Sequence, residues 1–350
     1  MTLDTNTSQR IMILNFILIA GVVFLHTPSY VPMAEVTNTP FALFKAFIQN
    51  AVFRTTVPMM ACISGYLLFQ AGTVFTAPVA MLKKKLCTIG VPFLVFNLSL
   101  LAAAYVAQKQ FGITMSVDLV HADTAALLDT AFGVQSAPIN YPLHYLRDLL
   151  VVLFLSPLMG VMLRHVPYLG LVAVLYLFIG NVDGPVVRSG EIAVMFYLGG
   201  LAAVRNWNLR ALDHCAVVAF VLFLVICAHV VATRTESTTW LQLASPFLLW
   251  PASALLQGTR FGEYCARMSK YSFFIYIAHA PVLFATWFVY HKVQHILPYE
   301  LYWAIAPVVT IAIMVTLFCA CNTFMPRLFA VVLGGRAAPR ACSRIKTFSV

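Results

Sequence analysis

The feature that most constrains this chain is a series of ten apolar runs, many of them close to the roughly 20 residues that an α-helix needs to cross a bilayer. Only 10% of the residues are charged and 61% are hydrophobic, which leaves too little charge to cover a water-exposed surface. The sequence therefore predicts an all-α polytopic membrane protein with about ten transmembrane helices in one bundle; nine or eleven remain open because the fourth to sixth runs are short. The runs cover residues 11–30, 50–70, 86–108, 146–163, 166–182, 190–204, 211–232, 240–257, 272–290 and 302–325.

One membrane-embedded domain, residues 1–330, holds all ten runs, and residues 331–350 are expected to form a short basic tail. The only long loop extends from Lys109 to Tyr141, and we expect it to include a small re-entrant or interfacial piece. No fixed-period repeat is visible along the chain. This disfavours a transporter, because many transporters are built from two matching halves.

The basic residues are divided unevenly between the two sides of the membrane that ten spans define. Fifteen of the 22 lysines and arginines fall on the side of the termini, and seven fall on the other side. Cytoplasmic loops carry the excess of Lys and Arg, so both termini are expected in the cytoplasm. The net charge of +10 is spread over short loops, which argues against a nucleic-acid partner.

Of the histidines that lie inside or at the end of apolar runs, two are candidates for chemistry, because an ionisable group there costs roughly 2.5–3.5 kcal/mol on insertion scales and needs a reason. His26 ends the first run in its outer half, and Asn15, eleven residues earlier, lies on the same helical face. His279 lies in mid-span, and Pro281 after it is expected to free backbone carbonyls nearby. The alternatives are an idle histidine at the headgroup boundary for His26, and a buried histidine bonded to a carbonyl for His279.

Arg54 opens the second span from the outer side and is followed by Ser64 and Gly65. Arg54 either points into the bundle or extends to the interface. Gly65 next to Ser64 is expected to let another helix approach closely, which is a packing role.

Further polar groups lie at the two ends of the bundle. Tyr145, Arg147 and Asp148 enter the fourth span from outside, where an aromatic ring beside a charged pair suits a sugar; a helix-start ion pair explains the same residues. On the cytoplasmic side, a cluster of three lysines at residues 83–85, just before the third span, suits either anionic lipid headgroups or the phosphates of a nucleotide. The cysteines form no C-x-x-C pair or Cys/His cluster, so no metal site is expected. The cytoplasmic cluster consists of Lys83, Lys84 and Lys85.

Five stretches in order give the chain a resemblance to the acyltransferase-3 family of bacterial integral membrane acyltransferases, which modify surface polysaccharides. They are LNFILIAGVVFLH ending at His26, RTTVPMMACISGYLLF from Arg54, KKKLCTIGVPFLVFN from Lys83, PLHYLRDLLVVLFLSPLM from Pro142, and YSFFIYIAHAPV from Tyr271. The resemblance implies a multi-pass protein of the bacterial inner membrane and an O-acyltransferase, most simply an O-acetyltransferase. It also implies that no cofactor is bound permanently and that acetyl-CoA or another acyl-CoA is the cytoplasmic donor. The acceptor it implies is a glycan or lipid-linked saccharide, and membrane lipids are expected to surround the chain.

The resemblance also implies roles for particular residues. His26 matches the catalytic histidine, and Arg54 matches a family arginine expected at the catalytic site. Residues 145–148 and His279 match positions expected to bind substrate, and the lysine run matches a basic motif expected to bind the donor. Two departures stand out: Asn15 occupies a position that is usually basic, and lysines replace a motif that is commonly arginine-rich.

A mechanism follows as a hypothesis. His26 acts as the base that takes the acceptor's hydroxyl proton, or as a nucleophile that forms an acyl-imidazole. Arg54 and Arg147 steady the oxyanion or bind the acceptor. This predicts that His26, Arg54 and Arg147 line one cavity. The rival is a transporter or flippase for a glycolipid or small anionic solute, and a purely structural membrane protein comes third.

Overall fold

The computed structural model describes residues 4–113, 117–180 and 187–336, and its regular elements there are helical. Seven helical segments are long and apolar enough to cross a membrane. Three further helices at predicted runs are shorter: α9, α10 and α12 have 13, 15 and 14 residues. The all-α polytopic architecture is confirmed, and ten spans stays a prediction. The principal helices are α1 (Thr5–Leu25), α3 (Thr56–Gln70), α6 (Val91–Phe111), α8 (His144–His165), α9 (Pro167–Ile179), α10 (Gly190–Val204), α11 (Ala216–Ala232), α12 (Thr239–Ala252), α14 (Ser272–Val293) and α15 (Tyr299–Phe324).

Shorter helices connect or extend these. Three of the long segments begin earlier than hydropathy predicts, because a short helix joins the front of α3, α6 or α14. The long loop before α8 contains the nine-residue helix α7, and the re-entrant or interfacial placement expected for a piece of this loop stays a prediction. The short helices are α2 (Pro40–Ala46), α4 (Thr73–Thr76), α5 (Pro78–Lys85), α7 (Thr124–Phe132), α13 (Arg260–Met268) and α16 (Pro326–Val332).

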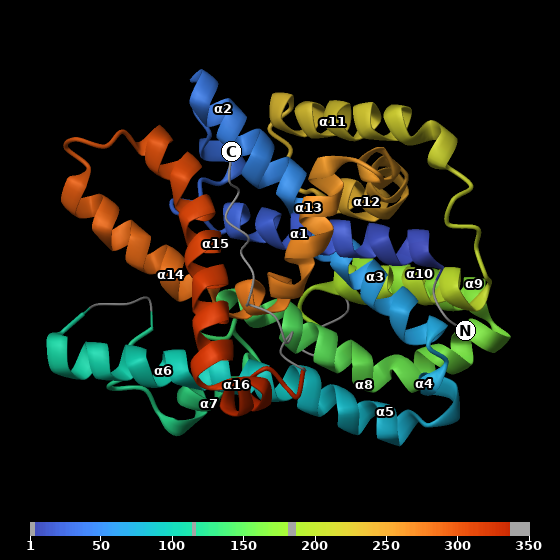
Figure 1. Ribbon diagram of the computed structural model, residues 1–350, viewed down its shortest axis with the longest axis horizontal. Helices are drawn as coiled ribbons and strands as arrows, with labels where there is room; N and C mark the ends of the chain where they lie inside the picture. Colours follow the sequence, from blue (N-terminus) through green and yellow to red (C-terminus); the bar gives the residue numbers. More distant parts are fainter. Residues whose placement is uncertain (1–3, 114–116, 181–186, 337–350) are drawn as a thin grey trace.

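Helix α1 runs through the middle of the bundle, between α3, α13 and α14 (Figure 1). Asp4 caps its first turn, because the Asp4 carboxylate accepts from the Thr7 amide at 2.9 Å. The Thr7 hydroxyl and amide hold the pKa of Asp4 below its ordinary value. At the other end His26 is the C-cap residue, so this central helix carries the histidine to the end of the bundle opposite the start of α1.

Helices α3 and α10 pack unusually closely. A Cβ atom on Gly65 would lie 2.0 Å from the Phe196 carbonyl oxygen, and one on Gly199 would lie 2.0 Å from the Cys62 carbonyl oxygen. Only glycine fits at either place, because any side chain would push the two backbones apart. The predicted packing role of Gly65 is confirmed.

Candidate active site

A cavity of about 420 Å³ lies at the C-terminal end of α1, and we call it the outer cavity after the side of the membrane on which the sequence predicts it. His26 and Arg54 both line it. The His26 ring lies edge-on to Tyr141, with ring centroids 4.8 Å apart. The Arg54 guanidinium donates to the Tyr30 hydroxyl at 2.7 Å, so it is held at the cavity and does not extend away from it.

His26 and His279 are in contact, although 253 residues separate them in the sequence. His26 Nδ1 lies 3.1 Å from His279 Nε2, and the two ring planes are nearly parallel, with an interplanar angle of 3° and centroids 5.4 Å apart. His279 is completely buried, at 0% exposure. The two histidines therefore form one unit, of which only His26 lines the outer cavity among the described residues.

The hydrogen bonds of His279 assign the protons on both rings. His279 Nδ1 lies 2.8 Å from the Tyr276 carbonyl oxygen and 3.1 Å from that of Ile275. A carbonyl only accepts, so His279 Nδ1 carries a proton, and Nε2 of the neutral ring is an acceptor. His26 Nδ1 then donates to it, which leaves the lone pair on His26 Nε2. That lone pair is what a general base or a nucleophile requires.

Pro281 leaves a backbone carbonyl of α14 free for another donor, as the sequence predicts. Proline has no N–H to offer the carbonyl four residues earlier, which belongs to Ile277. That carbonyl instead accepts from the side-chain Nδ2 of Asn140 at 3.2 Å. The backbone N–H of Asn140 in turn donates to Asn97 Oδ1 at 2.9 Å. The bond to α14 fixes the turn that carries Tyr141 and Pro142 into the outer cavity.

A second, inner cavity of about 320 Å³ lies along the other half of α1. Its lining includes Asn15 and Ile19 of α1, and the outer cavity begins at Val22. Three helical residues rise about 4.5 Å, so the two cavities nearly meet. Tyr276 lines both. The bundle therefore contains two cavities, one along each half of α1, and they approach each other about one helical turn before His26.

Tyr145 is one of the described residues that line the inner cavity. Its hydroxyl lies 3.3 Å from the Ser64 hydroxyl, and its ring packs edge-on against Tyr276. Of the three clustered lysines, Lys85 lines the inner cavity, whereas Lys83 and Lys84 are exposed. The proposed roles of these residues stay predictions.

Arg147 is not among the described residues that line the outer cavity, so the prediction that it shares a cavity with His26 and Arg54 is wrong. Its guanidinium pairs with the fully buried Asp148 at 2.7 Å. Asp148 also accepts from the Ser189 amide at 2.9 Å, which anchors the start of α10. These bonds match the alternative of an ordinary ion pair, and sugar binding by this pair stays a prediction.

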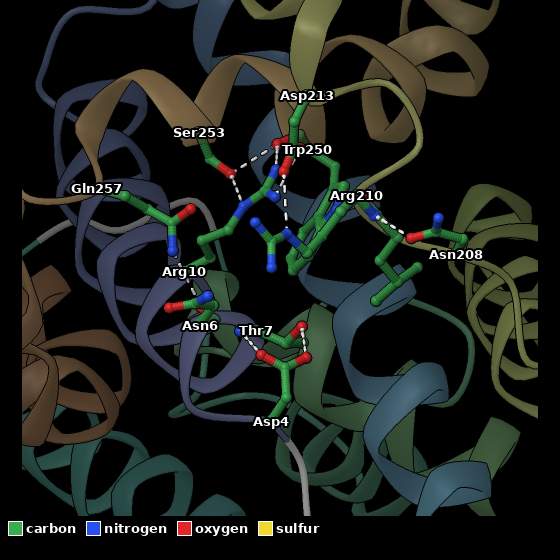
Figure 2. Close-up of polar contacts among 11 residues, drawn as sticks. Asp4, Asn6, Thr7, Arg10, Asn208, Arg210, Asp213, Trp250, Ser253 and Gln257 are labelled. Atoms are coloured by element: carbon green, nitrogen blue, oxygen red, sulfur yellow. Dashed lines mark hydrogen bonds and ion pairs between the residues drawn. The ribbon is translucent and has the colours of Figure 1, made fainter.

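Arg10 sits in a network at the opposite end of α1 (Figure 2). Although arginine is a charged residue, only 1% of it is exposed. Its guanidinium pairs with Asp213 at 2.7 Å, donates to Ser253 Oγ at 3.0 Å, and lies over the Trp250 ring. Arg10 is thus engaged by protein groups that tie α1 to α12 and to the loop before α11.

Sequence reasoning missed several polar residues of the outer cavity. Glu191, His144 and Gln242 line it, and Glu191 is the only carboxylate among its described lining residues. Glu191 lies in the first turn of α10, at the edge of an apolar run. The rule that flagged His26, an ionisable group at membrane depth, would also have flagged Glu191.

A separate cavity of about 440 Å³ between α3, α10 and α12 has no charged or histidine residue in its described lining, so we assign no chemistry to it.

Comparison with known proteins identifies the family of this chain. A family model described as an acyltransferase domain, Acyl_transf_3, matches residues 10–321. The chain belongs to the acyltransferase-3 family. A relative is the succinoglycan biosynthesis protein ExoH of Rhizobium meliloti (strain 1021), which is 31% identical over 353 residues, covering 97% of this chain and 95% of the relative. No solved structure gives a significant match. Membership makes the chain a multi-pass membrane acyltransferase, and the matched residues include both histidines of the site.

Proposed function

We propose that this acyltransferase moves an acyl group, most simply acetyl, from a cytoplasmic acyl-CoA to a hydroxyl of a surface polysaccharide or lipid-linked glycan. The observation that carries the proposal is the chain of hydrogen bonds from the Tyr276 carbonyl through His279 to His26 at the outer cavity. The succinoglycan role in the relative's name supports a polysaccharide acceptor. The expected location is the bacterial inner membrane, with both termini cytoplasmic.

The chemistry uses the lone pair on His26 Nε2. It takes the proton of the acceptor hydroxyl while that oxygen attacks the thioester carbonyl. The tetrahedral oxyanion that forms is stabilised by a positive donor, for which Arg54 is placed in the same cavity. The C–S bond then breaks, and the thiolate leaves with the proton that His26 has held. Direct attack by His26 Nε2 on the thioester carbonyl uses the same lone pair: the C–S bond breaks, the CoA thiolate leaves, and the acceptor hydroxyl then takes the acyl group from the acyl-imidazole and restores the free histidine.

The two cavities suggest how donor and acceptor meet. The eleven residues from Asn15 to His26 rise about 16 Å, a distance that the long pantetheine arm of a CoA donor spans from the inner side. The acceptor enters the outer cavity. Binding both reactants next to His26 makes an otherwise bimolecular reaction effectively unimolecular, which lowers the entropic part of its barrier.

The direct test is a transfer assay with the purified protein in lipid vesicles. Acetyl-CoA labelled in its acetyl group is supplied with and without cell-envelope glycolipid, beside His26→Ala and the exposed-histidine control His165→Ala. We expect label in the glycolipid with the wild type and the control, and a loss of roughly 10²–10⁴-fold in His26→Ala. A folded wild-type protein that moves no label would reject an acetyl-CoA donor. Uptake of intact glycolipid without acylation would favour the transporter.

A further inference from the structure

The end of the described chain contributes a residue to the lining of the inner cavity. After α15 the chain forms α16, which lies against α6 (Figure 1), and then turns back at Gly334. Gly334 has φ +74°, and a Cβ atom there would lie 2.5 Å from the Cys87 carbonyl oxygen. Only glycine permits this turn and this close approach. The turn holds the next residues, up to Arg336, against the bundle. Residues 337–350 of the predicted tail lie outside the described part.

Arg336 lines the inner cavity together with Lys85. Its guanidinium lies 3.3 Å from the centroid of the Phe273 ring, which faces the same cavity. Burial lowers the pKa of Arg336 to about 10, so the side chain keeps its charge at neutral pH. Lys85 is close enough for the two positive charges to repel each other.

This pair of cations has no protein counter-charge within the described structure. No carboxylate is among the described residues that line the cavity, and no ion pair is recorded there for Lys85 or Arg336. Arg10, by contrast, has Asp213. Two partly buried like charges are unfavourable unless an anion joins them.

Ser272 supplies an independent observation. It lines the same cavity, is only 2% exposed, and its Oγ has no hydrogen-bond partner in the described structure. A buried hydroxyl without a partner is costly, which points to a ligand atom that completes it.

We propose that Arg336, Lys85 and Ser272 bind a phosphate group at the inner cavity, and that this phosphate belongs to the nucleotide part of the acyl donor. The second half of this statement rests on the proposed function. Arg336 lies beyond residues 10–321, the part matched by the family, so the guanidinium comes from a segment outside the matched domain. A phosphate-bearing lipid headgroup offers the same chemistry, and the test separates the two sources.

The experiment measures binding to the full-length protein in nanodiscs of purely zwitterionic lipid. Inorganic pyrophosphate, CoA and pantetheine are titrated against the wild type, Arg336→Gln, Ser272→Ala and Arg327→Gln. Arg327 is the matched control, because it is an exposed arginine of α16. We expect Arg336→Gln to weaken pyrophosphate and CoA about ten- to hundredfold and to leave pantetheine unchanged. Ser272→Ala should weaken both anions by less, and Arg327→Gln should match the wild type.

Two further variants test the geometry. Gly334→Val should weaken CoA as Arg336→Gln does, since it displaces the turn but keeps the guanidinium. Asn15→Arg, placed in the Arg336→Gln background, should restore much of the binding, because residue 15 lines the same cavity.

The outcomes are distinct. Pyrophosphate affinity that is the same in the wild type and in folded Arg336→Gln would overturn the site. Arg336-dependent pyrophosphate binding without CoA binding would keep the anion site and reject the donor assignment. Arg336-dependent CoA binding that vanishes when anionic lipid is added would show that a lipid headgroup is the ligand, and would also overturn the donor assignment.

Discussion

At the scale of single residues, the hydrogen bonds of His279 decide which nitrogen of His26 can accept a proton. The carbonyls of Ile275 and Tyr276 fix the proton on His279 Nδ1, and His279 Nε2 then fixes the proton on His26 Nδ1. His279 was expected to bind substrate, but it is fully buried behind His26 and is better placed to orient that residue.

This arrangement predicts different effects for two substitutions of His279. His279→Ala removes the acceptor for His26 Nδ1–H, so the turnover number should fall by roughly 10²-fold or more, while the KM for the acyl donor stays unchanged. His279→Gln offers a carbonyl oxygen in the same direction and should recover part of the loss. Steady-state kinetics check this. Equal losses in both variants, or a change confined to KM, would contradict the positioning role.

The Arg10 network makes a prediction about stability. Asp213→Asn weakens the charged partner of a buried arginine, so it should lower the free energy of unfolding by about 1.5–3 kcal/mol. Arg210→Gln is the control, because Arg210 is largely exposed and lies 3.7 Å from the same carboxylate, a pair expected to contribute little. Thermal unfolding in lipid nanodiscs distinguishes them, and comparable shifts would contradict the account.

At the scale of elements, the sequence predicts the helices well and their starts less well. Apolar length locates the cores of the long helices, because each must satisfy its backbone in lipid. The predicted third span begins at residue 86, whereas the helical segment begins at Pro78, since the lysines before it lower the hydropathy without breaking the helix. The segment ending at Val293 likewise begins at Arg260, in the charged helix α13.

The sequence predicts a contact between two helices only where a particular residue type requires that contact. Gly65 predicted a close helix approach, and α10 provides it. The pairing of His26 with His279, and of Lys85 with Arg336, joins segments far apart in the chain, and no local pattern specifies which segments meet. Arg336 also lies in what the sequence presented as a plain basic tail.

The contact between α3 and α10 can be tested with one methyl group. Gly65→Ala places a Cβ against the Phe196 carbonyl, so the free energy of unfolding should fall by about 1–3 kcal/mol. Gly90→Ala is the matched control, because its nearest neighbour would be a Leu86 side-chain carbon at 3.7 Å, an ordinary contact. Thermal unfolding compares the two, and an unchanged Gly65→Ala would show that the helices are free to separate.

At the scale of the whole molecule, the excess of basic residues predicts that both termini are cytoplasmic. A green fluorescent protein fused to the C-terminus should therefore fluoresce in intact bacteria, and an alkaline phosphatase at the same place should be inactive. A dark fluorescent protein together with an active phosphatase would reverse the orientation. The cavity here called inner would then face the outer side of the membrane.

The central claim is that donor and acceptor reach His26 from opposite sides of the bundle. It is tested most directly in sealed vesicles of uniform protein orientation, with labelled acetyl-CoA on the Arg336 side and glycolipid acceptor accessible on the His26 side. The account predicts label in the glycolipid with the wild type, little with His26→Ala, and little when acetyl-CoA is supplied only from the His26 side. Equal labelling from either side, or full labelling by His26→Ala, would contradict it.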